Sequence, residues 1–99
     1  MLTQTIENVY GNNRKRSSVE ICADILMVAK KGAKKSHIVY KANLNFKLLE
    51  KYLDRLQNSD MITGPMINNL FRTTEKGIEY LNHFRELRDF LSFGESHIL

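Results

Sequence analysis

Two lysines spaced four residues apart, Lys47 and Lys51, are the side chains of this sequence best placed to bind a charged partner. Residues with this spacing lie on the same side of an α-helix, and Arg55 continues the series. Their ammonium and guanidinium groups only donate hydrogen bonds, so they suit phosphate oxygens and the acceptor edges of nucleic-acid bases. The alternative is a solvated helix face on which Glu50 and Asp54 pair with the lysines.

Other basic and polar side chains extend this candidate surface on both sides. The basic run Arg14–Arg16 ends a polar N-terminal arm, which either solubilises the chain or lies along a phosphate backbone. Asn43 and Asn45 suit helix caps first and nucleic-acid contacts second, and Asn68 and Asn69 suit a turn. The candidate residues for nucleic-acid binding are Arg14, Lys15, Arg16, Lys34, Lys35, Ser36, His37, Lys41, Asn43, Asn45, Lys47, Lys51, Arg55 and Arg72.

The distribution of charge favours a polyanionic partner for the first half of the chain. The 99 residues carry a formal net charge of +4. Eleven Lys/Arg and four Asp/Glu lie between Arg14 and Arg55, a balance of +7, whereas residues 56–99 have four and six, a balance of −2. A basic front half beside a mildly acidic back half indicates different partners for the two, although a generic lysine-rich surface would carry the same charge.

The composition provides little for catalysis or metal binding. The single cysteine, Cys22, lies among apolar residues, as a small core residue would in a reducing cytoplasm. Three histidines and one cysteine give no convincing ligand spacing, and His37 suits the surface better than a metal site. We find no nucleophile–base pair and no phosphate-cradling loop. The sequence therefore predicts a protein that is not an enzyme and needs no metal or cofactor.

The hydropathy pattern indicates one small domain away from the membrane. No apolar run approaches the roughly 20 residues needed to cross a bilayer. The N-terminus has no basic stretch followed by an apolar core, so we expect no secretory signal. The expected location is the cytoplasm, in association with the nucleoid.

Local signals predict a first helix that begins at the end of the N-terminal arm. Ser17 or Ser18 suits the cap, and apolar residues recur at helical spacing from Val19 to Ala29. Two lysines and Gly32 then suit its end.

Two further helices are predicted almost end to end. Ser36 is the expected cap of a helix of about two turns, and the stretch "ANLN", residues 42–45, ends it and starts the next. The third helix runs from Phe46 to about Asn58, with Leu44 filling the core at the bend. Its expected apolar side consists of Phe46, Leu49, Tyr52, Leu53 and Leu56.

The second half of the chain is predicted to contain a hairpin and a long helix. Met61–Thr63 and Leu70–Thr73 flank a turn with Pro65, which is unsuited to a central strand. Thr73 or Thr74 then caps a helix whose end we expect near Phe93, followed by a loose tail.

This order of elements is that of a winged helix-turn-helix. The fold class is therefore α+β and mainly α, with three helices, a two-strand wing and a long C-terminal helix. We divide the chain into a flexible basic arm (1–16), the winged helix-turn-helix domain (17–73), a dimerisation helix (74–93) and a tail (94–99).

The core "ILMVAKKGAKKSHIVYKANLNFKLLEKYL" and the helix start "TTEKGIEYL" resemble the small archaeal winged-helix DNA-binding proteins. The resemblance covers about Arg14 to Leu91. It implies a transcriptional regulator or chromatin-associated protein that dimerises through the helix after the wing, often as an antiparallel coiled coil. The wing "TGPMINNLF" departs from the family pattern, because it is short and has no Lys or Arg before Arg72.

The last helix has its own signal for a second subunit. Its apolar residues follow a four-three-four spacing that suits a helix–helix seam, and they exceed what a small domain readily covers. The alternative is that this stripe packs on the first helix of its own chain. The candidate dimerisation residues are Tyr80, Leu81, Phe84, Leu87, Arg88 and Leu91.

These observations predict a homodimeric, sequence-specific regulator of transcription that binds double-stranded DNA. Its third helix, about residues 45–58, is expected to enter the major groove. Two alternatives stay open: a non-specific chromatin or architectural protein, and a protein-interaction adaptor that reuses the fold. The sequence gives no sign of a small-molecule substrate.

Overall fold

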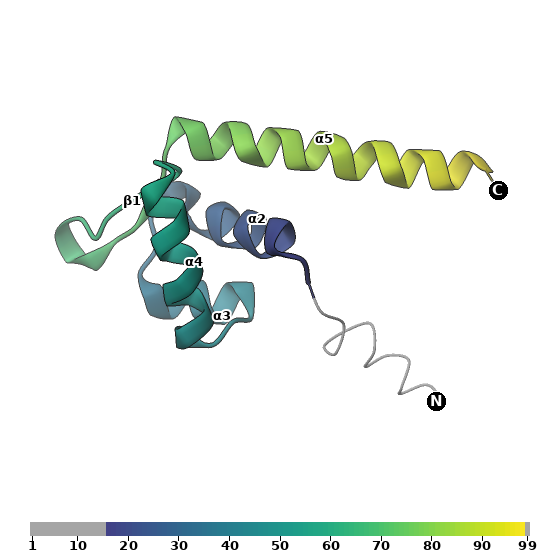
Figure 1. Ribbon diagram of the computed structural model, residues 1–99. Coiled ribbons are helices and arrows are strands. Elements are labelled where there is room, and N and C mark those ends of the chain that lie inside the picture. Colours follow the sequence, from purple (N-terminus) through teal and green to yellow (C-terminus); the bar gives the residue numbers. More distant parts are fainter. Residues whose placement is uncertain (1–15, 99) are drawn as a thin grey trace, which may run out of the picture.

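The computed structural model describes residues 16–98, with side chains described as far as Ser92. Arg14 and Lys15 of the predicted basic arm lie outside the described residues. Helices α2 (Ser18–Val28), α3 (Lys35–Ala42) and α4 (Phe46–Asn58) form a cluster. A hairpin projects from one side of this cluster, and α5 (Glu75–Ile98) runs along it and extends past its other side (Figure 1).

Helix α2 is held at its start by a reciprocal pair of hydrogen bonds. The Glu20 amide donates to Ser17 Oγ (3.2 Å), and the Ser17 amide donates to Glu20 Oε1 (2.9 Å). This capping box satisfies two amides that a helix start leaves without partners, and it confirms Ser17 as the cap. A 3₁₀ turn, η1 (Ala29–Lys31), follows, and Gly32 ends it with a φ of 97°, which favours glycine.

The tight turn between α3 and α4 depends on two asparagines, as predicted. Asn43 takes the left-handed conformation (φ 57°, ψ 55°) that ends α3. Asn45 then caps α4, because its Oδ1 accepts a hydrogen bond from the Leu48 amide (2.7 Å). Leu44, between them, is buried in the core as expected.

Helix α3 begins earlier than the sequence indicated. Lys34 is the cap residue, so Ser36, the predicted cap, lies inside the helix. The reason is a backbone pairing that no local signal reveals. Ala33 and Phe71 exchange amide–carbonyl hydrogen bonds of 2.9 and 2.8 Å, which holds the chain extended up to the first turn of α3.

The wing is a short antiparallel hairpin formed by β1 (Ile62–Thr63) and β2 (Arg72–Thr73). Ile62 pairs with Thr73, and Thr63 pairs with Arg72. The strands are shorter than the segments predicted, because the connection tightens into a second 3₁₀ turn, η2 (Ile67–Asn69). The Ala33–Phe71 bridge extends this small sheet beyond the predicted two strands.

Helix α5 starts where expected but continues further. The Thr74 hydroxyl accepts a hydrogen bond from the Gly77 amide (3.1 Å) and donates one to the Asp60 carbonyl (2.7 Å). The predicted end near Phe93 is wrong, because the helix continues through Gly94 to Ile98. A lone glycine costs a helix only about 1 kcal/mol relative to alanine, so it weakens a helix without ending it.

A single core lies between α2, α3, α4, the hairpin and the start of α5. Its largest fully buried side chains are Ile25, Leu26, Ile38, Leu49 and Ile62. This arrangement confirms the predicted fold class of three helices, a two-strand wing and a long C-terminal helix. Within residues 16–98, no helix is long and apolar enough to span a membrane.

We predict that Gly77→Ala destabilises the fold although alanine favours helices. A Cβ at Gly77 would overlap the Met61 carbonyl oxygen and lie 2.5 Å from Thr73 Cγ2, and the backbone there cannot move without breaking the hairpin. We expect the free energy of unfolding, measured in urea, to fall by about 2 kcal/mol. Lys76→Ala, one residue away and exposed, is the control and should change it little. A Gly77→Ala variant as stable as that control would contradict this close packing.

Candidate nucleic-acid interface

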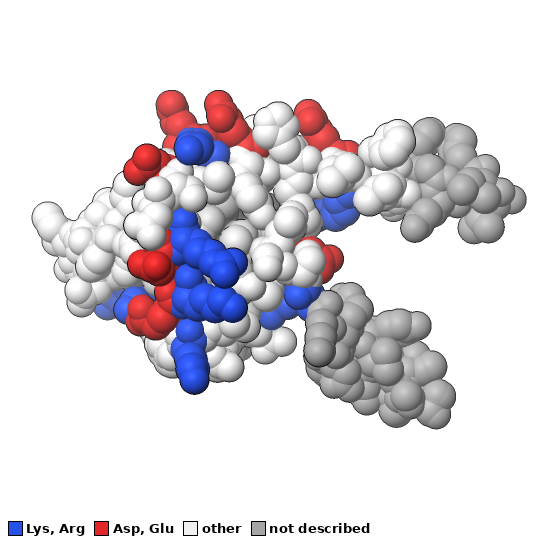
Figure 2. Space-filling view, in the orientation of Figure 1, with Lys and Arg blue, Asp and Glu red and all other residues white. Residues whose placement is uncertain are grey.

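A stripe of cations runs along the outer side of α4. Lys47, Lys51 and Arg55 are all exposed, and their spacing of four residues places them on the side away from the buried Leu49 and Leu56. Figure 2 shows a column of Lys and Arg side chains over the position that α4 occupies in Figure 1. Neither the hairpin nor α5 covers this stripe, which is therefore open to a partner.

The ring of Tyr52 makes cation–π contacts with two of these cations. Lys51 Nζ lies 5.5 Å and Arg55 Cζ 5.4 Å from the ring centroid. Cation–π contacts at such sites are worth about 0.5–1 kcal/mol, enough to bias both side chains towards one side of the helix. The ring is itself held by a hydrogen bond between its hydroxyl and Ser18 Oγ (3.1 Å). Sequence reasoning placed Tyr52 in the core but missed this second role.

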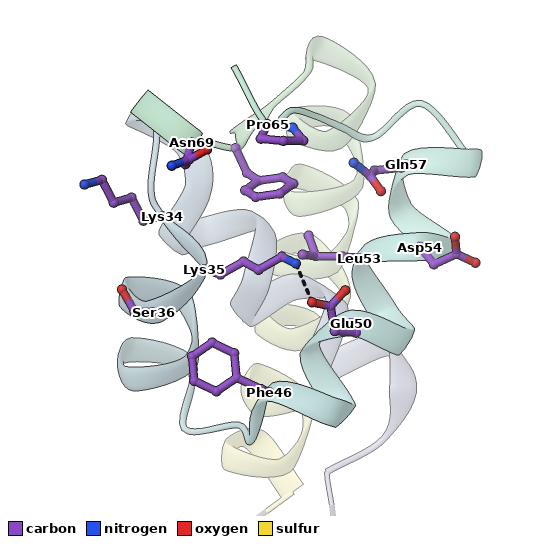
Figure 3. A pocket seen from close by; sticks show the side chains of 11 residues that line it. Lys34, Lys35, Ser36, Phe46, Glu50, Leu53, Asp54, Gln57, Pro65 and Asn69 are labelled. Carbon is purple, nitrogen blue, oxygen red and sulfur yellow. Dashed lines mark hydrogen bonds and ion pairs between the residues drawn. The ribbon is translucent and has the colours of Figure 1, made fainter. Parts of the chain in front are cut away.

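Glu50 and Asp54 form a second, acidic stripe on the wing side of α4. Glu50 makes an ion pair with Lys35 of α3, drawn as a dashed line in Figure 3. Among residues 16–92, no ion pair joins Lys47 or Lys51 to Glu50 or Asp54. The alternative interpretation, in which Glu50 and Asp54 pair with these lysines along the helix, therefore does not apply. Lys47 and Lys51 stay available to a partner.

A pocket of about 580 Å³ lies between the start of α3, α4 and the wing. Figure 3 shows the Lys35–Glu50 pair across its middle and the ring of Phe46 at one end, whereas Asp54 points away from it. Phe46 was predicted to belong to the apolar side of α4, yet it is about half exposed. As the first residue of the helix it faces this pocket instead of the core.

The remaining candidates on α3 lie beside this pocket or on the outer surface of the helix. Lys34 and Ser36 line the pocket rim and are exposed, and His37 and Lys41 are exposed as well. Arg72 lies on β2, beside Gly32, at the base of the wing and not at its tip.

Arg16 has a structural role that the sequence did not indicate. Its guanidinium pairs with Asp24 Oδ2 (2.6 Å) and donates to the carbonyls of Ala42 and Asn43 (2.8 Å each). It thus satisfies carbonyls that the end of α3 leaves without intrahelical partners. Because these donors are engaged within the chain, we leave Arg16 out of the interface. The partners are far apart in sequence, so no local pattern could have revealed them.

Helix α5 presents an apolar groove on the side next to α2. It has a volume of about 360 Å³, and its apolar lining residues are Val19, Met61, Tyr80, Phe84 and Leu87. Val19, the first of the apolar residues at helical spacing in α2, is exposed and faces this groove. The Tyr80 hydroxyl donates to the Val19 carbonyl (2.8 Å), and burial raises the pKa of Tyr80 to about 12, so the hydroxyl stays protonated at neutral pH.

The predicted dimerisation residues divide between two sides of α5. Leu81 is only 3% exposed and packs in the chain's own core, so its assignment to a dimer surface is wrong. Leu87 and Leu91 are more than half exposed. Arg88 lies over the ring of Phe84, with its Cζ 5.8 Å from the ring centroid.

Comparison with known proteins places this arrangement among winged helices. A model of the winged helix-turn-helix family matches residues 15–92. The crystal structure of Sso10a-2, a DNA-binding protein from Sulfolobus solfataricus, is similar with a TM-score of 0.69 and 25% identity, over 84% of this chain and 93% of that one. ZitR from Lactococcus lactis shares the fold, with a TM-score of 0.56 and 18% identity over 95% and 77% of the two chains. No curated protein matches by sequence.

We predict that Asn45 contributes to stability through its cap. Asn45→Ala removes the acceptor for the Leu48 amide and should lower the free energy of unfolding in urea by about 1 kcal/mol. Asn45→Asp is the matched control, because aspartate caps as well as asparagine does and should keep the stability near that of the parent. Equal stability of the alanine and aspartate variants would show that the cap is unimportant.

Proposed function

Because the chain belongs to the winged helix-turn-helix family, we propose that it is a homodimeric regulator of transcription that binds double-stranded DNA, with α4 in the major groove. The observation that carries this proposal is the open cationic stripe Lys47–Lys51–Arg55 on the helix that follows the tight turn. The structural similarity to Sso10a-2, a DNA-binding protein, supports it.

The dimensions and polarity of α4 suit a major groove. A helix with its side chains is about 10–12 Å across, and the groove is about 12 Å wide. Lys47 lies in the first turn, at the end of the helix that usually reaches the base edges. The helix is capped and packed along its buried side, so its backbone loses little conformational entropy on binding.

Basic residues of α3 provide the phosphate contacts in this proposal. Lys34, His37 and Lys41 are exposed on the helix that precedes the turn, the element that crosses the DNA backbone in helix-turn-helix proteins. Lys35 contributes less, since Glu50 already neutralises it. Phosphate contacts supply affinity without sequence information.

A non-specific chromatin protein is the second candidate. The observation that favours it is the use of lysines at Lys47 and Lys51, because an ammonium group is a point charge without the forked geometry that reads a base edge. In both cases the protein would act on chromosomal DNA in the cytoplasm. Affinities for random and promoter-derived duplexes at one fixed salt concentration separate the two candidates.

Dimerisation is proposed to occur through the exposed side of α5. The groove beside Tyr80 continues into Leu87, Phe90 and Leu91, which together expose a run of large apolar side chains. Such a contiguous patch indicates a binding surface in a small protein. A second copy would cover it by two-fold symmetry and would present two α4 helices to the same duplex.

We predict that the double variant Lys47→Ala, Lys51→Ala weakens duplex binding and its dependence on salt. Each phosphate contact contributes about −0.9 to the slope of log affinity against log salt, so the slope should become about 1.8 less steep. Fluorescence anisotropy over a salt titration measures this change. Arg85→Ala, an exposed residue of α5 outside the groove beside Tyr80, is the control and should leave the slope unchanged. Undiminished binding by the double variant would place the DNA surface elsewhere.

We predict that Leu87→Glu converts the dimer to a monomer, because it buries a carboxylate in an apolar seam. Light scattering coupled to size exclusion should show the mass halved. Asn82→Glu places the same charge on the opposite side of α5 and is the matched control. A Leu87→Glu variant that stays dimeric would exclude this side of α5 as the interface.

A further inference from the structure

The wing tip, residues 64–71 between β1 and β2, presents apolar side chains where a phosphate-binding wing would carry cations. None of its eight residues is charged. Ile67 is 82% exposed, and its neighbour Met66 is 41% exposed. Isolated apolar side chains are common on surfaces, but a large aliphatic pair at the tip of a projecting loop keeps apolar area in water that a partner could bury.

Internal hydrogen bonds hold Ile67 in this position. The Met66 amide donates to the Leu70 carbonyl (2.7 Å), and the Asn69 amide donates to the Met66 carbonyl (2.9 Å). Asn68 and Asn69 both adopt left-handed backbone conformations, with φ of 67° and 61°, which closes the loop tightly. The exposure of Ile67 is therefore a property of an ordered turn.

The wing is attached to the cationic helix. Gln57 Nε2 of α4 donates to the Gly64 carbonyl (2.8 Å), and Phe71, at the other end of the wing, is buried in the core. Figure 1 shows the wing projecting beside α4. If α4 lies in a major groove as proposed, this attachment directs the wing tip towards the neighbouring backbone and the minor groove beyond it.

The charges between α4 and the wing tip give that backbone little electrostatic hold. Glu50 and Asp54 line this side of α4, Lys34 and Lys35 line the same pocket from the start of α3, and Lys35 is paired with Glu50. These opposite charges nearly balance, and the wing tip itself carries none. The exposed pair Met66–Ile67 is therefore the feature of the wing tip that a partner could bind.

We propose that Ile67, flanked by Met66, enters the minor groove as an apolar wedge that unstacks a base step and bends the duplex. Apolar wedges of isoleucine or methionine act in this way in minor-groove binders. The side-chain amide groups of the exposed Asn68 and Asn69 lie next to the wedge and can donate to the acceptors that A·T pairs present there. Pyrimidine–purine steps such as TA unstack most easily, so the wedge selects DNA by deformability. This inference rests on the proposed function.

The test compares the bend of a duplex with a central TA step when bound by the parent protein and by Ile67→Ala. End-to-end fluorescence energy transfer should report a bend of roughly 20–90° for the parent, the range of known wedges. Ile67→Ala should bind through α4 but leave the duplex close to straight, and it should lose the preference for the TA duplex over a stiff A-tract. Met27→Ala, a half-exposed methionine on α2, is the control and should bend DNA as the parent does.

Ile67→Lys distinguishes the wedge from a wing that lies on phosphates. A wedge predicts loss of bending by this variant. A wing on phosphates predicts tighter binding to both duplexes, a salt slope steeper by about 0.9 and an unchanged bend, and that result would overturn the proposal. So would a parent protein that binds without bending, or an Ile67→Ala variant that binds and bends the duplex as the parent does. A folded parent that binds neither duplex would instead refute the proposed function itself.

Discussion

The burial of one side of α4 is the constraint on which the surface chemistry of this chain depends. Leu49, Leu53 and Leu56 pack inward, where α4 meets α2, α3 and β1. An α-helix is rigid, so fixing this side fixes the direction of every other residue on it. A slip of one residue would rotate the helix by about 100° and bring charged residues into the core. The same apolar side that stabilises the domain thus decides that Lys47 and Lys51 face water.

The opposite charges of α4 are separated in a way that follows from the same geometry. Residues 47, 51 and 55 form one stripe, and residues 50 and 54 form the next one round the helix. The two stripes have different partners. The Tyr52 ring makes cation–π contacts with Lys51 and Arg55, and Lys35 of α3 pairs with the carboxylate of Glu50. The helix therefore offers a cationic surface on one side and a nearly neutral, partly apolar pocket towards the wing.

Local signals were sufficient to predict the order and type of the main helices and strands, although not every end, because each depends on residues close in sequence. Ser17, Asn43 and Asn45 mark helix ends by side-chain or left-handed backbone chemistry, and α4 begins and ends where its sequence indicated. The features that were missed join residues far apart: the Ala33–Phe71 bridge and the clamp of Arg16 on the end of α3. In the site, the cationic stripe could be predicted from spacing alone. The engagement of Lys35, the burial of Leu81 and the exposure of Phe46 and Ile67 depend on how the elements pack, which periodicity does not specify.

Only one residue, Thr74, separates β2 from α5, and it is tied to the Asp60 carbonyl while Gly77 lies close against Met61. The long helix therefore leaves the domain at a fixed angle, as a rigid extension and not as a flexible linker. Its 24 residues span about 36 Å, close to one turn of B-DNA. In a dimer joined along α5, the position at which the two α5 helices cross would set the distance between the two α4 helices. That distance decides whether both α4 helices can face the same side of a duplex.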